Sequence, residues 1–320
     1  MNDFLETYSK FIKSPITVVD VGANEFPIEG AIARLAPICE VHAAEPQKDK
    51  IKELEKKNNI IPYKKFKYYN YGLAETSGEK ILNIAMDSHA SSIYEPNKEI
   101  LRRVRNDKNF DTKEKTSIKC ITLSELLNMS SIKFVDFLNI TAGANELNII
   151  KGAGEKLKNI SIINCQVEFI KVWKDQPVFD DVLSYLRRFG FRFIKFVDLH
   201  EVDGKKMWGK GIFIQEKFED EDRLIKAGIF LIESDLFEEA RWLFLDHQLN
   251  EEIYQKLFHK LIHERYGRIN IILKINSIVK KITQHIKPLE LIRLKIVNII
   301  KKKKIGAGAS TVSKIYPKKK

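Results

Sequence analysis

The stretch Ile16-Thr17-Val18-Val19-Asp20-Val21-Gly22-Ala23-Asn24 is a run of β-branched apolar residues that stops at a polar turn containing a glycine. Such a run predicts a strand that is buried on both faces, as in the middle of a parallel sheet. Residues 27–35, which follow the turn, can begin a helix. Strand, turn and helix form the first half of a βαβ unit, in which a ligand binds beyond the carboxyl end of the strand.

A second apolar strand, residues 41–44, ends at Glu45. In nucleotide-binding folds, an acidic residue about twenty positions after the glycine turn commonly accepts hydrogen bonds from ribose hydroxyls. Gly22 and Glu45 together predict a nucleotide-like cofactor, but they do not identify it. A nicotinamide cofactor is disfavoured, because the first turn lacks the G-x-G-x-x-G pattern.

Strands and helices alternate along roughly the first 200 residues. We expect further strands at 67–71, 80–84, 117–121, 134–140, 160–167, 191–196 and 211–215. We expect helices between them at 49–59, 98–109, 123–128, 146–158 and 179–189. This alternation predicts an α/β fold with a mostly parallel sheet and helices on both faces.

The sequence also predicts a division of the chain into three parts. Residues 1–218 would form the α/β domain, and residues 219–264 a helical extension packed on it. Residues 265–320 would form a basic tail, amphipathic and helical at first and then disordered, because its end is rich in Gly, Ser and Lys.

The net charge of +12 is concentrated in that tail. Residues 265–320 hold 16 Lys and Arg against one acidic residue, a charge of +15, whereas the rest of the chain carries −3. Such a helix can contact an anionic membrane surface at its periphery or the phosphates of a nucleic acid. Nucleic acid is the less favoured partner, because the tail has no Trp or Phe for base stacking. In a third interpretation, the basic charge of the tail only reflects the composition of the chain and implies no partner.

The remaining composition predicts a cytoplasmic protein. Three cysteines, Cys39, Cys120 and Cys165, lie in or beside apolar runs, and we expect them to be buried, reduced thiols. The first residues do not resemble a signal peptide, and no run of about 18 apolar residues predicts a membrane span. His259 and His263 have the spacing of a metal pair but no third ligand, so we expect no metal site.

Three stretches, in the correct order, resemble the FkbM-type methyltransferases. Residues 18–24 with 44–47 resemble the first family signature, D-V-G-A-N followed later by F-E-P. Residues 135–146, VDFLNITAGANE, resemble the second signature, D-F-L-K-I-D-x-x-G-x-E. Residues 166–179 with 190–191 are similar to a third region.

This resemblance implies a Rossmann-like class I methyltransferase that uses S-adenosylmethionine and methylates a hydroxyl group of a saccharide or related metabolite. The cofactor loop would be formed by Asp20, Gly22, Ala23 and Asn24. Glu45 would bind the ribose. Two serines that match a recurrent Ser-Ser/Thr-Leu/Ile pattern, Ser91 and Ser92, would lie near the cofactor.

Several positions depart from the family pattern. Phe26 replaces the usual second glycine, although Gly30, in a Pro-Ile-x-Gly stretch found in a subgroup, can supply the flexibility. The family Lys, Asp, Gly and the Glu of the next strand are replaced by Asn139, Thr141, Ala144 and Gln166. Two hypotheses therefore stay open, an active O-methyltransferase and a catalytically degenerate relative that serves as a binding or interaction module. A nucleic-acid methyltransferase or binder is a third possibility.

Methyl transfer to an alcohol needs an aligned hydroxyl group and a base that removes its proton. Thr141 occupies the position of a family acid but cannot act as a base. Glu146, Glu168 and His89 are the candidates, although Glu146 also suits the first turn of a helix and His89 a surface loop. We therefore expect Glu146, Glu168 and Thr141 to line the catalytic site.

Overall fold

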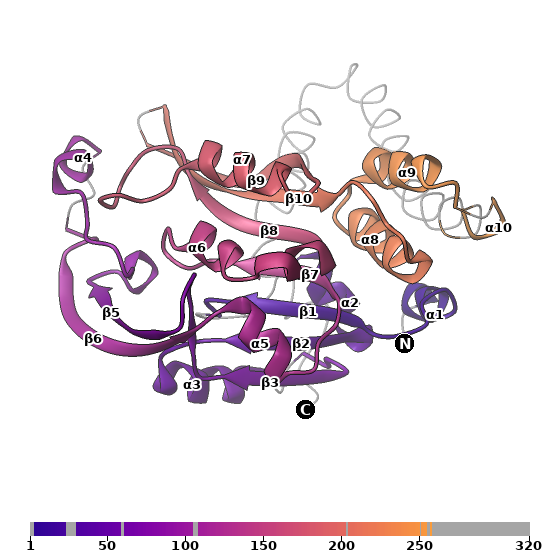
Figure 1. Ribbon diagram of the computed structural model, residues 1–320, viewed down its shortest axis with the longest axis horizontal. Coiled ribbons are helices and arrows are strands. Elements are labelled where there is room, and N and C mark those ends of the chain that lie inside the picture. The colour runs from indigo at the N-terminus through magenta and orange to yellow at the C-terminus, as the bar shows by residue number, and fades with distance from the viewer. Residues whose placement is uncertain are drawn as a thin grey trace, which may run out of the picture. The chain divides into compact units, whose positions relative to one another are not determined.

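The computed structural model describes residues 3–23, 30–58, 61–104, 108–202, 204–249, 251–254 and 257 (Figure 1). The chain falls into two compact units. The larger comprises residues 14–28 and 36–227, and the smaller comprises residues 1–13, 29–35 and 228–320. Residues 265–320 lie outside the described part, so the predicted tail and the predicted domain boundaries remain predictions.

The larger unit is built on a sheet of seven described strands in the order β3-β2-β1-β7-β8-β10-β9. The strands are β1 (Ile16–Val21), β2 (Cys39–Ala44), β3 (Lys65–Tyr69), β7 (Val135–Ile140), β8 (Ile160–Glu168), β9 (Phe191–Val202) and β10 (Lys205–Gln215). Every neighbouring pair is parallel except the two that β10 forms with β8 and β9. The predicted mostly parallel, Rossmann-like sheet is confirmed.

One face of this sheet is covered by the helices α5 (Leu123–Met129), α6 (Glu146–Lys151) and α7 (Phe179–Arg187), which lie in front of it in Figure 1. Alternate residues of the strands, such as Val19, Leu138 and Ile163, are fully buried against these helices. Each buried aliphatic side chain of this kind contributes about 1.5–3 kcal/mol. This packing is the main core of the unit.

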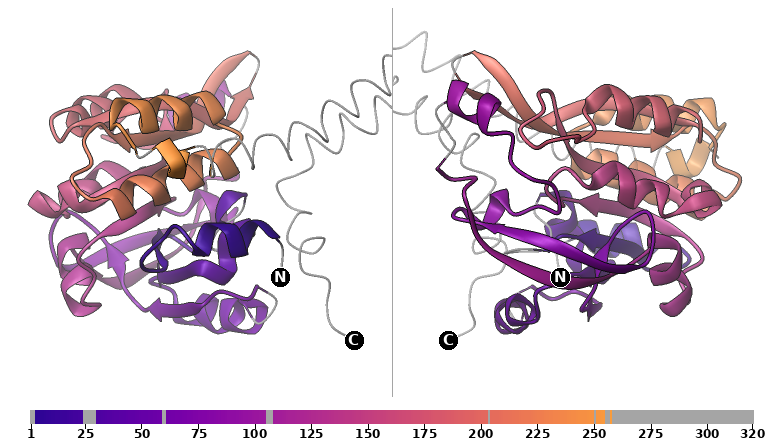
Figure 2. Two further views of the ribbon diagram at one scale, coloured as in Figure 1. Left: turned by 90° about the vertical axis from the view of Figure 1, so that its right-hand side faces the viewer. Right: turned by 60° about the vertical axis from the view of Figure 1, so that its left-hand side comes forward.

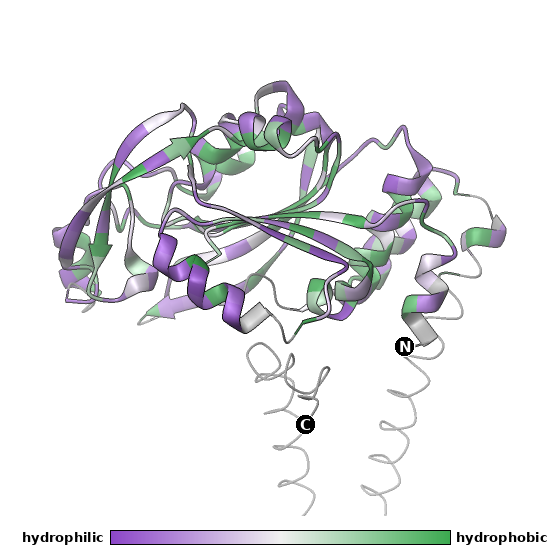
Figure 3. Cartoon of the chain, turned by 90° about the horizontal axis from the view of Figure 1, so that it is seen from below, coloured by the Kyte–Doolittle hydropathy of each residue, from purple (hydrophilic) through white to green (hydrophobic). Residues whose placement is uncertain are grey.

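The other face is covered near β2 and β3 by α3 (Lys48–Asn58), which is predominantly hydrophilic (Figure 3). Its buried Leu54 packs against Ala43 of β2, with Phe66 and Tyr68 of β3 beside it. Asp20 pairs in register with Ala43, so its side chain points to this second face. The predicted cofactor residues are therefore on the side of the sheet opposite the main core.

Two sequence signals explain where helices begin and end. α5 begins with a capping box, in which Thr122 Oγ1 accepts from the Glu125 N–H at 3.1 Å and the Glu125 carboxylate accepts from the Thr122 N–H at 2.8 Å. The helix predicted over 146–158 stops as α6 at Lys151, and a 3₁₀-helix follows over Gly154–Asn159. The interruption comes at Gly152, where a Cβ would lie 2.3 Å from the Ala74 carbonyl oxygen.

A second, three-stranded sheet joins β4 (Gly72–Leu73), β6 (Thr112–Ile121) and β5 (Gly78–Ala85), in that order (Figure 2). β6 starts five residues before the predicted strand, and α4 (Lys98–Arg103) ends before the predicted 109. Small 3₁₀-helices lie at Ala36–Ile38 and Ser88–Ala90. A separate core, which contains Leu101, Trp173 and Met207, links α4, the segment after β8 and the β9–β10 hairpin.

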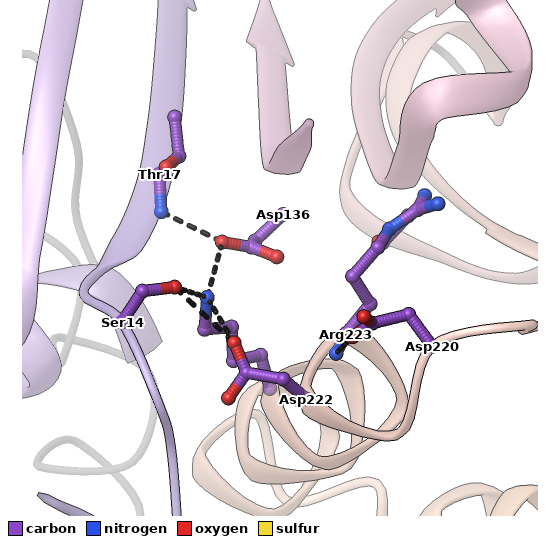
Figure 4. Close-up of polar contacts among 8 residues, drawn as sticks. Ser14, Thr17, Asp136, Asp220, Asp222 and Arg223 are labelled. Carbon is purple, nitrogen blue, oxygen red and sulfur yellow. Dashed lines mark hydrogen bonds and ion pairs between the residues drawn. The ribbon is translucent and has the colours of Figure 1, made fainter. Parts of the chain in front are cut away.

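A buried ion-pair network lies at the amino-terminal edge of the sheet (Figure 4). Lys226 of α8 (Glu221–Glu233) is 4% exposed, and its Nζ is 2.9 Å from Asp222 Oδ2 and 3.4 Å from Asp136 Oδ2. Lys226 also donates to Ser14 Oγ at 2.8 Å, and Asp136 accepts the Thr17 N–H at 2.8 Å. The network joins the beginnings of β1, β7 and α8 within the larger unit.

The described part of the smaller unit is helical. It contains α1 (Asp3–Ser9), α2 (Ala31–Leu35), the second half of α8, α9 (Phe237–Asp246) and α10 (Glu251–Tyr254). The buried Glu233 carboxylate accepts from Tyr8 Oη at 2.7 Å and pairs with Arg34 Nε at 2.8 Å. This charged contact connects three segments that are distant in sequence.

The predicted burial of the three cysteines is confirmed, because all are free and buried. Burial raises the pKa of the Cys39 and Cys165 thiols well above its usual range. Within the described residues we find no helical stretch with the length and apolar character needed to traverse a bilayer. The predicted histidine pair, His259 and His263, lies outside the described residues.

Candidate functional site at the carboxyl edge of the sheet

The first two family-like stretches meet where β1, β2 and β7 end. β1 lies between β2 and β7, so the turns after these strands are neighbours. The Gly22 N–H donates to the Ala44 carbonyl at 3.1 Å, and the Thr141 N–H donates to the Val21 carbonyl at 2.9 Å. These two bonds continue the sheet ladder by one residue and hold the turns after β1 and β7 side by side.

Gly22 is required by this close approach. Its φ of +78° lies in the left-handed region, and a Cβ at this position would be 1.9 Å from the Thr141 carbonyl oxygen. Ala23, the next residue, is buried beside Ala43 and Leu54. Asn24 and Phe26 lie outside the described residues, so their predicted roles remain predictions.

Asp20 is buried, and its carboxylate is only partly satisfied. Asn139 Nδ2 donates to Asp20 Oδ1 at 2.7 Å, while Asp20 Oδ2 has no hydrogen-bond partner among the described residues. Desolvation raises the pKa of Asp20 to about 7, and the opposing effects of Asn139 and of the Lys210 charge are smaller. Asn139, at the position of the family lysine, therefore gives Asp20 a neutral hydrogen-bond donor in place of a cationic one.

The amide of Asn139 continues into a second amide. Asn164 Nδ2 of β8 donates to Asn139 Oδ1 at 2.9 Å, so Asp20, Asn139 and Asn164 form a chain across three neighbouring strands. Asn164 was not among the predicted site residues. Its signal is an amide side chain in the mostly apolar run 160–165, but only the register of β7 and β8 places it beside Asn139.

Glu146 and Glu168 form a pair of buried carboxyl groups. Glu146, the first residue of α6, accepts the Ala142 N–H at 2.7 Å through Oε1, while its Oε2 has no partner among the described residues. Glu168, the last residue of β8, accepts from Gln166 Nε2 at 2.9 Å. Gln166 and Glu168 are therefore on one face of β8, as the sequence predicts.

Burial raises the pKa of both Glu146 and Glu168. The negative charge of Glu168 raises the pKa of Glu146 further, because two neighbouring carboxylates disfavour simultaneous ionisation. Each of the two carboxyl groups therefore holds its proton to a higher pH than an exposed glutamate does. Such a pair can accept a proton from a bound hydroxyl group.

Glu45 directly follows β2, on the opposite side of β1 from Thr141. It is 3% exposed, its Oε1 accepts the Gln47 N–H at 2.9 Å, and desolvation raises the pKa of its carboxyl group. Among the described residues, the Thr141 hydroxyl has no hydrogen-bond partner. His89 is exposed, and its Nδ1 lies 3.1 Å from Asp87 Oδ1. His89 is therefore a surface residue.

The two predicted serines have hydrogen bonds that shape the site. Ser92 is buried; its hydroxyl donates to the Gly143 carbonyl and accepts the Tyr94 N–H at 3.0 Å. The Ser91 hydroxyl accepts the Ala85 N–H at 3.1 Å. Ser92 thus connects the segment after β5 to the turn that precedes Glu146, and contact of either serine with a cofactor remains a prediction.

We expect Ser92→Ala to lower the free energy of unfolding by about 1–3 kcal/mol, because it leaves a buried carbonyl and a buried N–H without a partner. Urea unfolding followed by circular dichroism measures this change. The exposed Ser88, in the same segment, gives the matched control Ser88→Ala, for which we expect a change within about 0.5 kcal/mol. Equal effects of the two substitutions would contradict the structural role of Ser92.

No curated protein matches the chain. Three solved structures with distant similarity are described as methyltransferases or a methylase. An rRNA methylase from Streptococcus thermophilus has 11% identity and a TM-score of 0.33, with 67% of this chain and 94% of that chain covered. A magnesium protoporphyrin IX methyltransferase from Synechocystis PCC 6803, with bound S-adenosylmethionine, has 9% identity and a TM-score of 0.34 over 67% and 76% of the two chains.

A third structure is a putative tRNA (m1A22) methyltransferase from Streptococcus pneumoniae in complex with S-adenosylmethionine. It has 13% identity and a TM-score of 0.34, with 82% of this chain and 100% of that chain covered. The family assignment rests on a different comparison. A family profile described as the methyltransferase FkbM domain matches residues 20–193, more than half of the chain and the whole of the edge described above. The chain therefore belongs to the FkbM-domain methyltransferases.

Proposed function

We propose that this methyltransferase uses S-adenosylmethionine and transfers the methyl group to a hydroxyl group of a saccharide or a related metabolite. The observation that carries the proposal is the buried pair Glu146 and Glu168 at the carboxyl edge, with pKa values raised by burial. A general base works best when its pKa lies near the pH of the reaction. Glu168, whose pKa is raised by burial to about 7, meets that condition.

The residues present fit the cofactor. Gly22 lets the turns after β1 and β7 lie close together beneath the site. Asp20 Oδ2, which is buried and has no partner among the described residues, suits a cationic or hydrogen-bond-donating group. Glu45, at the end of the neighbouring strand, suits the ribose hydroxyls. When bound, the cofactor would supply a methyl group that is already activated by the positive sulfonium.

The protein's own contribution would then be alignment and proton removal. Asp20, Gly22 and Glu45 would orient the donor, and the turn held by Ser92 would place Glu146. Whichever of Glu168 and Glu146 is ionised would accept the hydroxyl proton as the oxygen attacks the methyl group, and that carboxyl group would become neutral. Thr141 would line the site through its free hydroxyl without acting as a base.

A catalytically degenerate module is the alternative, favoured by the neutral side chains of Asn139, Thr141 and Gln166. It would keep the fold and the cofactor loop but transfer no methyl group. A nucleic-acid acceptor is disfavoured on the sequence alone, and contact of the basic tail with a membrane is a prediction about residues that the structure does not describe.

Calorimetric titration with S-adenosylmethionine and S-adenosylhomocysteine tests the cofactor site. We expect micromolar binding of both and a roughly 10–100-fold loss of affinity in Glu45→Gln, because a hydrogen bond to a charged group contributes about 1.5–3 kcal/mol. Glu40→Gln, at the opposite end of β2, is the matched control and should bind normally. Absence of binding by either compound would refute the cofactor assignment.

Methyl transfer from radiolabelled S-adenosylmethionine to a panel of saccharides and to RNA then separates the alternatives. Incorporation into a saccharide fraction is the expected result. Tight cofactor binding without transfer to any acceptor would favour the degenerate module, and incorporation into RNA would replace the saccharide by a nucleic acid.

A further inference from the structure

The β9–β10 hairpin contains an irregularity beside the site. In register, Val197 pairs with Lys210 and His200 pairs with Trp208, so two residues of β9, Asp198 and Leu199, lie opposite the single residue Gly209. This is a β-bulge, and Asp198 has a φ of +55°, in the left-handed region. A non-glycine residue in this conformation is costly, and such strain is frequent at functional sites.

The bulge decides which side chain lies next to Trp208. With regular pairing from Val197 onward, Leu199 would lie opposite Trp208 and His200 would point to the other face of the hairpin. With the bulge, Leu199 lies over Gly209, where its Cδ2 is 2.8 Å from the position of a Cβ. His200 instead stacks on Trp208, with ring centroids 5.3 Å apart and an interplanar angle of 17°.

This aromatic stack is continuous with the carboxyl pair. Trp208 is in register with Glu168 on one side and with His200 on the other, so the three side chains form a row across β8, β10 and β9. Directly paired antiparallel residues point to the same face of a sheet. Since β10 lies between the other two strands, the indole face opposite His200 is turned toward β8 and Glu168.

Part of Trp208 remains accessible to a ligand. Trp208 is half-buried and packs against the core that contains Leu101 and Met207, whereas His200 is exposed and Glu168 is buried. Among the described residues, no hydrogen-bond acceptor is paired with the Trp208 indole N–H. The row therefore offers an apolar ring face, a free N–H donor and a proton-accepting carboxyl group within neighbouring positions of one sheet.

We propose that Trp208, supported by His200, is the acceptor platform, and that it binds the apolar face of a pyranose ring whose hydroxyl group points to Glu168. This inference rests on the proposed function. A pyranose has carbon-bound hydrogens on one face and hydroxyl groups around its rim, so it can use the ring face, the indole N–H and the carboxyl group together. A purely apolar ligand would leave the N–H and the carboxyl group without partners.

Intrinsic tryptophan fluorescence tests the platform directly. The chain has three tryptophans; Trp173 is buried, and Trp242 on α9 is 54% exposed and is removed by Trp242→Phe. In this background, titration with the methyl pyranosides of glucose, galactose, mannose and rhamnose should change the fluorescence for at least one sugar. Trp208→Ala should weaken binding of that sugar, measured by calorimetry, by about tenfold or more, and Trp208→Phe should retain most of the affinity.

Three results would overturn the platform: no pyranoside binds, Trp208→Ala leaves sugar affinity unchanged, or Trp208→Ala weakens binding of an RNA hexamer instead of a sugar. Affinity for S-adenosylmethionine, measured on the same variants, should not change with Trp208→Ala. Normal cofactor binding with failed sugar binding would refute the platform alone, whereas failed cofactor binding would refute the proposed function. Trp242→Ala controls for the loss of an exposed tryptophan.

Discussion

Replacing Lys226 by alanine is expected to lower the free energy of unfolding by about 3–5 kcal/mol, because it leaves buried carboxylates without their counterion. Lys226 is 4% exposed and lies within ion-pair distance of Asp136 and Asp222. Burial disfavours the ionised form of Asp136 and raises its pKa. The charge of Lys226 is the largest effect that opposes this rise. Urea unfolding at pH 7 measures the loss.

Two controls separate this charge effect from simple loss of volume. Lys174→Ala removes an exposed ion pair with Glu95 and should cost less than about 1 kcal/mol. Combining Lys226→Ala with Asp136→Asn and Asp222→Asn should recover part of the stability, because the uncompensated charges are gone. A large loss in Lys226→Ala that the two Asn substitutions fail to reduce would point to packing instead.

The pH dependence of the free energy of unfolding tests the same network. Burial already raises the folded-state pKa of Asp136, and without the opposing charge of Lys226 it would lie further above its unfolded value, so stability of the variant falls as the pH rises. The deficit of Lys226→Ala should therefore shrink as the pH is lowered from 7 toward 5. A deficit that grows on acidification would contradict the network.

Glu168→Gln is expected to reduce kcat for methyl transfer by about 10²–10⁴-fold, as loss of a general base does, while it stabilises the fold above neutral pH. The two effects have one cause. Burial raises the folded-state pKa of Glu168, so its stabilising contribution is present at low pH and is lost as the pH rises through about 7. A glutamine does not ionise, so it causes no such loss of stability as the pH rises.

Unfolding of both forms at pH 6 and pH 8.5 measures the second effect. The wild-type protein should lose more stability between these two values than Glu168→Gln does, although Asp20 and Glu146 keep part of the dependence. Glu155→Gln, an exposed residue with an exposed Lys158 partner, should change neither kcat nor the pH dependence. Unchanged kcat in Glu168→Gln would remove Glu168 as the base.

The elements that position the site could be predicted from sequence because each carries a local signal. The buried run of β1, the glycine turn at Gly22 and the acid at Glu45 follow from residue type and spacing, and the structure brings them to one edge. The end of α6 was not predicted, because the helix expected over 146–158 stops at Lys151, before Gly152. Alternation of strand and helix patterns was sufficient for the parallel sheet.

The features that sequence reasoning missed depend on pairs of distant residues. Lys226 looks like an ordinary helix lysine until α8 places it against Asp136, ninety positions away. Asn164 becomes a site residue only through the register of β7 and β8. The stack of His200 on Trp208 depends on a bulge at Asp198, and no apolar periodicity marks a residue that changes the pairing by one position.

The buried cysteines have a practical consequence for chemical labelling. Only the thiolate reacts rapidly with alkylating reagents, and burial with raised thiol pKa values suppresses that form at Cys39 and Cys165. All three native cysteines are buried, so a single cysteine substituted for an exposed residue of the β9–β10 hairpin or of α9 can carry a fluorophore or spin label without removal of the native cysteines. The slow rate at which the native thiols are modified then measures transient opening of the core, since each sulfur reacts only when the residues around it separate.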